Sequence, residues 1–125
     1  MIYLDTHVVV WVYAFAAERL SGRALELIEH SSRVLISPMV LLELEFLQET
    51  GKVAAPPGII HEYLSDRIGL EICGKDFRKV VRNAMRHTWT RDPFDRLITA
   101  QAALENDVLV TKDRLIRDNY PRAVW

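Results

Sequence analysis

Short, mostly apolar runs alternate with longer stretches of mixed apolar and polar residues along this chain. Brief apolar runs bounded by polar or turn-forming residues are typical of buried strands. The sequence predicts strands over residues 1–4, 34–36, 70–73 and 108–111, with an edge strand over 123–125. Helical spacing predicts helices over residues 8–17, 23–30, 38–50, 59–68, 75–87 and 93–106. This alternation predicts an α/β fold in three layers (α/β/α), with a central parallel sheet covered on both faces by helices.

Capping residues set several of these boundaries. Ser37 and Asp92 each precede a proline, which is the pattern of an N-cap with proline at the first helical position. Gly51 is expected to end the helix that begins at Pro38. Residues 54–58 predict a turn that is too short to separate two domains. We therefore expect the 125 residues to form a single domain, 1–125.

The composition is that of an ordinary globular protein, with 50% hydrophobic and 26% charged residues. A single cysteine, Cys73, excludes an intramolecular disulfide, argues against a thiolate zinc site and fits a reducing cytoplasm. The apolar run from Val8 to Ala17 is too short to span a bilayer. Asp5 and His7 stand before it, where a signal peptide would carry basic residues. The expectation is a cytoplasmic protein that does not enter a membrane.

Four carboxylates stand at positions that an α/β sheet would bring together. Asp5 and Asp113 each follow a predicted strand, Asp95 lies in the first turn of a predicted helix, and Glu43 interrupts an apolar helical stretch. Ligands of parallel sheets bind in the crevice beyond the carboxyl ends of the strands. Acidic groups gathered there raise one another's pKa unless a cation intervenes. The pattern therefore indicates a hard divalent cation with oxygen ligands.

Each carboxylate also has a structural alternative. Asp5 is a candidate N-cap of the next helix, Asp92 is read mainly as an N-cap, and Asp95 would gain from the helix dipole in either case. Asp113 is a candidate turn residue. Glu43 is expected to point into the protein, where an ion pair with an arginine is the alternative to a ligand role. Its predicted core-facing neighbours at helical spacing are Met39, Phe46 and Leu47.

The sequence resembles the PIN-domain ribonucleases, and in pattern the VapC-like toxins of bacterial toxin–antitoxin modules, over nearly its whole length. The segments that carry the resemblance occur in the family's order: LDTH at 4–7, SP at 37–38 leading to Glu43, DPFDRLITAQA at 92–102 and VTKD at 110–113. Thr99 departs from the family's pattern, in which a small apolar residue is common. This departure leaves the acidic positions intact, and we expect it to reflect local helix packing.

The resemblance implies a set of roles for residues of this chain. The family's catalytic acidic quartet falls on Asp5, Glu43, Asp95 and Asp113, none of which is missing. By this resemblance Asp5, Asp95 and Asp113 would be ligands of Mg²⁺ or Mn²⁺, Glu43 would orient a water or support a second ion, and Thr6 and Thr111 would stand beside the metal. The implied activity is hydrolysis of RNA. The implied partners are a cognate antitoxin protein and, as in many family members, a second copy of the chain.

Basic residues are concentrated before and around Asp95 although the net charge is −1. A stripe at helical spacing suits a phosphate backbone, and a solvated outer helix face is the alternative. Arg96 is expected to contact the scissile phosphate or to pair with a carboxylate, whereas His7 is expected to pack or hydrogen-bond near the site. The stripe that we predict to bind RNA consists of Lys75, Arg78, Lys79, Arg82 and Arg86.

Two functional hypotheses follow. The first is a metal-dependent endoribonuclease that acts as a toxin, and the alternative is a non-catalytic PIN-like module that binds RNA or a protein partner. The intact quartet favours the first. The loop after the first strand contains no glycine, which excludes a phosphate-cradling glycine motif there. His7 stands where a phosphatase with an aspartyl nucleophile would want a second aspartate.

Overall fold

The computed structural model describes residues 1–125 and contains one parallel sheet of five strands. The strands lie in the order β3-β2-β1-β4-β5. Their bounds are Ile2–Leu4 (β1), Val34–Ile36 (β2), Leu70–Ile72 (β3), Val108–Val110 (β4) and Ala123–Val124 (β5). From β1 the chain adds β2 and β3 on one side and then returns to add β4 and β5 on the other. The order therefore reverses between β1 and β4, which is the point where open α/β sheets bind ligands.

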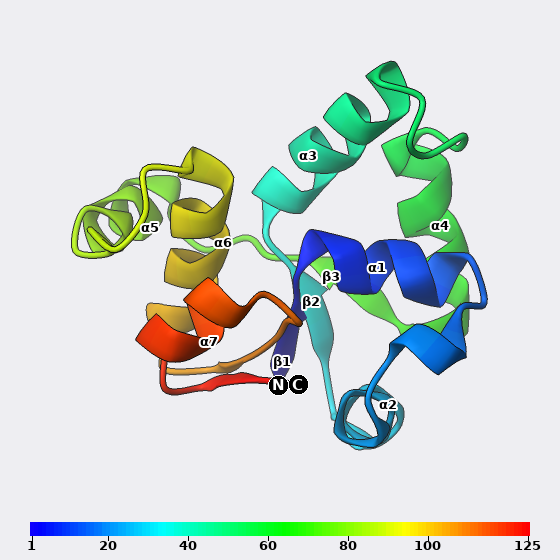
Figure 1. Ribbon diagram of the computed structural model, residues 1–125, viewed down its shortest axis with the longest axis horizontal. Helices are drawn as coiled ribbons and strands as arrows, with labels where there is room; N and C mark the ends of the chain where they lie inside the picture. Colours follow the sequence, from blue (N-terminus) through cyan, green and yellow to red (C-terminus); the bar gives the residue numbers. More distant parts are fainter.

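Seven α-helices and one short 3₁₀ helix connect these strands. Their bounds are Thr6–Tyr13 (α1), Ala17–Arg19 (η1), Gly22–His30 (α2), Pro38–Glu49 (α3), Pro57–Ile68 (α4), Phe77–Ala84 (α5), Pro93–Ala103 (α6) and Arg114–Asn119 (α7). In Figure 1, α5, α6 and α7 lie on one side of the central strands, and α1, α2 and α4 lie on the other. The predicted three-layer arrangement with a parallel sheet is confirmed. No helix combines the length and the apolar character needed to cross a bilayer.

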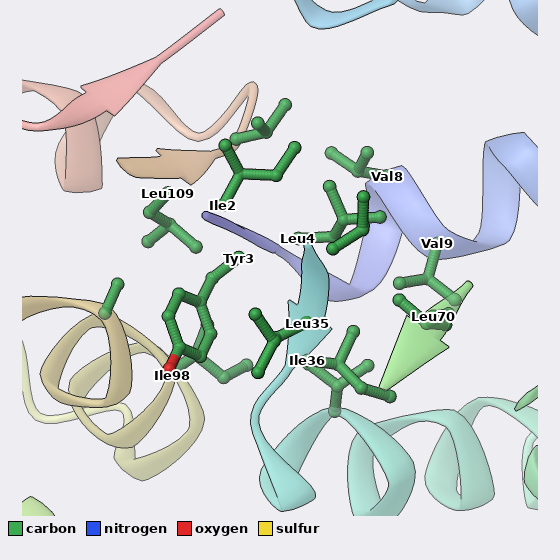
Figure 2. Close-up of a cluster of buried hydrophobic side chains, with 14 of the residues drawn as sticks. Ile2, Tyr3, Leu4, Val8, Val9, Leu35, Ile36, Leu70, Ile98 and Leu109 are labelled. Carbon is green, nitrogen blue, oxygen red and sulfur yellow. The ribbon is translucent and has the colours of Figure 1, made fainter. Parts of the chain in front are cut away.

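The core follows from the alternation of side chains along β1. Figure 2 shows Tyr3 on the side of Ile98 from α6, and Leu4 on the side of Val8 and Val9 from α1. All these side chains are buried. Because both faces of the sheet are covered, every residue of β1 is apolar or aromatic. The central strand is thereby fixed between the two helical layers, and so is Asp5, which follows it.

The capping signals identified from the sequence operate as expected. Ser37 caps α3 by accepting a hydrogen bond from the amide of Met39, and Asp92 caps α6 by accepting from Phe94. Both helices have proline at the first position. Gly51, which was expected to end α3, follows the C-cap Thr50 with a positive φ of 77°, which glycine adopts without a side-chain clash. Local residue chemistry thus fixes where α3 and α6 begin, and both begin beside the same end of the sheet.

Four predicted helices are wrong in extent. The helix expected over 59–68 is α4, which begins at Pro57 and so takes in the last two residues of the turn predicted over 54–58. The helix expected over 8–17 is α1, which begins at Thr6 because Asp5 caps it and ends at Tyr13, before Phe15 takes a positive φ of 54°. The helix expected over 75–87 is shorter, because Asp76 caps α5 and the chain turns after Ala84. The helix expected over 93–106 ends at Ala103, and Asn106 takes a positive φ of 59° before β4. Helix α7 was not predicted.

Candidate functional site

One pocket opens beyond the carboxyl ends of β1 and β4 and encloses about 370 Å³. It lies where the starts of four helices meet, because Asp5, Ser37, Asp92 and Asp113 cap α1, α3, α6 and α7. Helix N-termini favour negative charge nearby, which helps to hold several carboxylates at one place. The pocket is lined by Asp5, His7, Trp11, Glu43, Asp92, Asp95, Lys112 and Asp113. The structure therefore brings all four predicted acidic residues together, with Asp92 as a fifth carboxylate.

Asp5 is the most enclosed of these carboxylates, with 7% of the residue exposed. One oxygen, Oδ1, accepts a hydrogen bond from the amide of Thr6 at 2.8 Å, which is the N-cap of α1. The other, Oδ2, accepts from the hydroxyl of Thr111 at 2.6 Å. Burial raises the pKa of Asp5, and the hydrogen bonds from Thr111 and Thr6 oppose that rise. The capping and pocket roles weighed for Asp5 are thus compatible, because one side chain does both.

Two buried threonines fix the orientation of the carboxylates. The hydroxyl of Thr111 donates to Asp5 and accepts from the amide of Asp113 at 3.0 Å, which joins two pocket residues through one side chain. The hydroxyl of Thr6 donates to Oε1 of Glu43. Both threonines are fully buried. A buried hydroxyl with a defined partner holds that partner in place, so each threonine positions a carboxylate.

Glu43 reaches the pocket from the side of α3. Of its predicted core-facing neighbours, Met39 and Leu47 do pack against the core, and only Phe46 does not. The fully buried residues of α3 are Val40 and Leu44, whereas Phe46 is 46% exposed and its ring packs edge-on against Phe94 of α6 at 5.4 Å. The helix packs against both α4 and α6, so a second face meets neighbouring protein. Glu43 forms no ion pair, and its partner is a hydroxyl. The arginine pairing considered for it is therefore wrong.

Asp95 differs from the other acids because its carboxylate accepts no hydrogen bond from the protein. Its neighbour Asp92 accepts two through Oδ1, from the amide of Phe94 at 2.9 Å and from the amide of Asp95 at 3.4 Å. Burial, followed by the charges of Asp92, Asp5, Asp113 and Glu43, raises the pKa of Asp95 to about 7. Burial also raises the pKa of Glu43, with the charge of Asp5 adding to the rise and the Thr6 hydroxyl opposing it. The pocket thus holds more negative charge than its own cations balance.

The donor set of the pocket suits a hard divalent cation. Its charged lining offers carboxylate oxygens from five residues, with one imidazole and no thiolate. As the side chains lie, no three His, Cys, Asp or Glu side chains are close enough together to hold one ion. Mg²⁺ keeps several of its waters when bound by proteins, so contact through water from part of the set is compatible with its coordination. Asp95, with both oxygens free, is the acid best placed for direct ligation.

Asp113 also begins a helix that the sequence did not reveal. Its carboxylate accepts a hydrogen bond from the amide of Ile116 at 2.9 Å and so caps α7. It is therefore a helix N-cap as well as a pocket residue, and the turn considered as its alternative is the start of α7. In α7 only Ile116 is fully buried, which explains why periodicity gave no helical signal there.

Arg96 pairs with no carboxylate, so that predicted role is wrong, and its contact with the scissile phosphate stays a prediction. Its guanidinium donates to the carbonyl oxygens of Ala84 at 3.1 Å and Met85 at 3.3 Å, at the end of α5, and to that of Thr90 at 3.5 Å. These carbonyls are left without partners where a helix ends, and an arginine nearby satisfies them. Arg96 follows Asp95 directly, yet one step along a helix turns the side chain by about 100°, away from the pocket. It ties α5 to α6.

The predicted basic stripe is only partly correct. Lys75 precedes α5 and turns inward: its side chain is 14% exposed, its Nζ lies 3.5 Å from Asp107 and 3.6 Å from Glu105, and it sits over the ring of Tyr3 at 5.1 Å. Arg78 folds back on Asp76, the N-cap residue, at 3.0 Å. Lys79, Arg82 and Arg86 remain exposed and together line a separate cavity beside α6.

Two pocket residues were missed from the sequence. Trp11 lies one helical turn after His7 on α1, its ring 6.0 Å from the His7 ring, and it packs against Trp125 at 5.8 Å. Lys112 lies over the Trp11 ring at 5.8 Å. The spacing of His7 and Trp11 on one helix face is the signal that would have found the first. His7 lines the pocket and packs on Trp11, as expected of a neighbouring residue without a ligand role.

Thr99, the position that departs from the family pattern, is fully buried in α6, and its hydroxyl has no hydrogen-bond partner. It lies one turn after Asp95 and therefore on the same face of the helix, beneath the pocket. An unsatisfied buried hydroxyl is unfavourable. The side chain therefore fills space in the helix–sheet interface without adding to the polar contacts of the site.

Comparisons with known proteins match nearly the whole chain. Residues 2–120 match the model of the PIN domain. The chain is 32% identical over 127 residues to ribonuclease VapC22 of Mycobacterium tuberculosis, in an alignment that covers 98% of this chain and 95% of that protein. It is also similar to a chain in the crystal structure of VapBC2 from Rickettsia felis bound to a DNA fragment from their promoter. That likeness has a TM-score of 0.66 and 24% identity, and it covers 99% of this chain and 96% of the other.

Proposed function

Because this chain belongs to the PIN-domain family, we propose that its acidic pocket is the active site of a metal-dependent endoribonuclease, which hydrolyses phosphodiester bonds within RNA. The relative in Mycobacterium tuberculosis is named a ribonuclease, which supports this activity. The observation that carries the proposal is the gathering of five carboxylates around one pocket at the reversal point of the sheet. A phosphate diester is itself anionic, so this pocket requires cations before it can accept such a substrate.

In this proposal Asp5, Asp95 and Asp113 hold Mg²⁺ or Mn²⁺, directly or through water. A bound divalent ion would supply positive charge against the phosphate and favour ionisation of the attacking water. The threonines would keep the ligands oriented: Thr111 bonds to Asp5 and to the amide of Asp113, so the ligands that follow β1 and β4 are fixed relative to each other. Asp92 would keep the first turn of α6, and with it Asp95, in place.

Glu43 is assigned the task of orienting the attacking water and accepting its proton. A general base works best when its pKa lies near the working pH. Burial raises the pKa of Glu43 toward that range, and the Thr6 hydroxyl fixes Oε1 and leaves Oε2 free to accept from a water. Glu43 lines the same pocket as the three aspartates but reaches it from α3. Glu43 on α3 would therefore position the attacking water, while the metal ligands lie on other elements of the fold.

We further propose that this ribonuclease is the toxin of a toxin–antitoxin pair and acts in the cytoplasm. The name of the relative and the VapBC2 complex, which has the same fold, support this assignment. The lone cysteine, Cys73, is a buried free thiol, as suits a reducing compartment. The proposed partners are an antitoxin protein, which would block cleavage when bound, and a second copy of this chain.

The test is cleavage of a total RNA pool by the purified chain, with Mg²⁺ or Mn²⁺ and with EDTA. We expect discrete fragments with either metal, none with EDTA, and none with an Asp95→Asn variant. Asp66→Asn is the matched control, because Asp66 is an exposed residue of α4 outside the pocket. Cleavage that survives in Asp95→Asn would contradict the assigned site. Absence of cleavage by folded, metal-bound protein would favour the alternative of a non-catalytic RNA- or protein-binding module.

A further inference from the structure

A second charged cavity lies on the outer side of the α5–α6 pair. It encloses about 220 Å³ and is lined by Lys79, Arg82, Asn83, Arg86 and Leu104. Its three cationic side chains are exposed, and none of them forms an ion pair with a carboxylate of the chain. Each of their neighbours Lys75 and Arg78 does form one. The cavity therefore concentrates positive charge that the protein itself does not neutralise, although the net charge of the chain is −1.

A chain of hydrogen bonds orients the remaining polar group, Asn83. The indole Nε1 of Trp89 donates to Nδ1 of His87 at 3.2 Å, and an indole can only donate. Nδ1 is therefore unprotonated, so the neutral ring carries its proton on Nε2, which lies 2.9 Å from Oδ1 of Asn83 and donates to it. This contact occupies the carbonyl oxygen of the Asn83 amide. What Asn83 has left to offer a ligand is its NH₂ group.

The polar wall of the cavity consequently consists of donors: one ammonium, two guanidinium groups and one amide NH₂. Arginine in particular matches the oxygens of a phosphate with two parallel donors. The volume of about 220 Å³ corresponds to about seven waters at roughly 30 Å³ each, which is room for a phosphodiester group together with part of its hydration. Leu104 is the single hydrophobic residue of the lining, and the carbon chains of the basic residues provide further apolar surface beside their donors.

We infer that this cavity binds a backbone phosphate of the RNA substrate at a distance from the acidic pocket, and so acts as an anchoring site for single-stranded RNA. The inference rests on the proposed ribonuclease function. Helix α6 carries Asp95 in its first turn and ends beside Leu104, nine residues further on. At 1.5 Å per residue Leu104 lies about 14 Å from Asp95 along the helix, whereas Asn83 and Arg86 stand at the end of α5, which Arg96 joins to the start of α6. A polynucleotide can occupy both sites together, whereas a single nucleotide cannot.

The placement also resolves an electrostatic conflict in the proposed function. The acidic pocket repels a polyanion until its cations are bound, and five carboxylates around it offer the RNA strand no grip of their own. A donor-lined cavity along α5 would hold the strand by its phosphates without depending on the metal. Because this contact involves only backbone phosphates, the binding would be independent of base sequence and would weaken as the salt concentration rises.

The test measures binding of a fluorescein-labelled, mixed-sequence, single-stranded RNA oligonucleotide by anisotropy, with every protein in the Asp95→Asn background to prevent cleavage. The cavity variant combines Lys79→Gln, Arg82→Gln and Arg86→Gln. The control combines Lys52→Gln, Arg23→Gln and Arg122→Gln, which removes one lysine and two arginines that are equally exposed and unpaired. We expect the cavity variant to bind at least about tenfold more weakly. Its slope of log affinity against log salt should fall by about 0.7, because the cavity holds one phosphate of the strand.

Asn83→Asp tests the anion preference of the cavity separately, because it replaces the amide NH₂ donor by an acceptor and adds a negative charge with almost no change of shape. It should weaken RNA binding, whereas the control triple variant should bind like the parent. If the cavity triple variant keeps the parent's affinity and salt slope, the inference is overturned. It is equally overturned if that variant loses binding to a polyglutamate peptide while keeping its RNA affinity, since the cavity then serves an acidic protein partner.

Cleavage measured with Asp95 intact separates this inference from the proposed function. A dinucleotide is too short to reach from the acidic pocket to the cavity, so the cavity variant should cleave it at the parent's rate. The same variant should show a raised KM on long RNA. If the parent chain cleaves neither substrate with metal present, the ribonuclease proposal fails while the binding result still stands. If the cavity variant cleaves both substrates like the parent, the anchoring site fails while the ribonuclease proposal stands.

Discussion

Replacing Asp95 by asparagine should stabilise the metal-free fold at neutral and higher pH. Asp95 is half-buried, accepts no hydrogen bond and faces four other acids, so its negative charge opposes folding. Asparagine has nearly the same shape and no charge, and it leaves the N-cap of α6 untouched because Asp92 provides it. The substitution thus removes a repulsion without creating a cavity or removing a partner.

The magnitude follows from the pKa of Asp95, which rises from 3.8 to about 7 in the folded chain. Each factor of ten in an acid constant corresponds to about 1.4 kcal/mol, so a fully buried Asp95 carboxylate would lower the free energy of unfolding by about 4 kcal/mol when ionised. Solvent in the open pocket screens roughly half of this, which leaves about 2 kcal/mol. Because the folded-state pKa is the higher one, the folded chain keeps a proton that the unfolded chain releases. Stability therefore falls as pH rises from about 4 to about 7, and the full penalty persists above that range.

The assay is urea unfolding followed by circular dichroism, in EDTA, at about pH 5 and about pH 8. Asp95→Asn should exceed the parent's free energy of unfolding by about 2 kcal/mol at the higher pH and by less than half of that at the lower. Saturating Mg²⁺, at about 100 times its dissociation constant, should stabilise the parent by about 2.7 kcal/mol and the variant by less. An Asp95→Asn variant that is no more stable than the parent at about pH 8 in EDTA would refute the reasoning.

Two further substitutions test the contacts around the pocket. Thr111→Val should lower the free energy of unfolding by about 2 kcal/mol, because it removes the hydroxyl that donates to buried Asp5 and accepts from the amide of Asp113. Thr111→Ser keeps the hydroxyl and should lose much less. Equal losses in both variants would mean that packing matters and the hydroxyl does not. Arg96→Met should destabilise the fold by about 1–3 kcal/mol, because it uncaps α5, and should leave the cleavage rate of the folded protein unchanged; a slower rate at unchanged stability would return Arg96 to the active site.

The sequence was most informative where structure depends on neighbouring residues. The strand over 34–36 and the starts of α3 and α6 follow from short apolar runs and from caps such as Ser37 and Asp92, all of which are local signals. The proximity of Asp5 and Asp113 also follows from topology, because strands that run parallel bring the residues after them to one edge. Helix α7 escaped because its six residues carry too little apolar periodicity to stand out.

The sequence was least informative about long side chains, whose direction depends on tertiary neighbours. Lys75 has the spacing of the basic stripe but turns inward to Asp107, since it lies outside α5. Arg96 adjoins Asp95 but bonds to the end of α5, which only the folded arrangement brings near. Phe46 of α3 was misjudged for the same reason, because an apolar residue can serve a helix–helix contact, here with Phe94, rather than the core. Periodicity identifies that a face is apolar and leaves open which neighbour covers it.

Asp5 and Asp95 differ in what stabilises their negative charge, and this difference indicates different roles in the pocket. Asp5 is the more deeply buried, yet two hydrogen bonds stabilise its ionised form and oppose the effect of burial on its pKa. Asp95 has no such donor, and a bound cation would stabilise its charge directly. In the proposed enzyme Asp5 would therefore be a preformed anchor, whose geometry the threonines fix, and Asp95 would be the ligand whose ionisation depends on metal binding. Because Asp95 must release a proton to bind the ion, metal affinity should rise with pH up to about 7. The repulsion that destabilises the metal-free pocket would thus also favour binding of the cation.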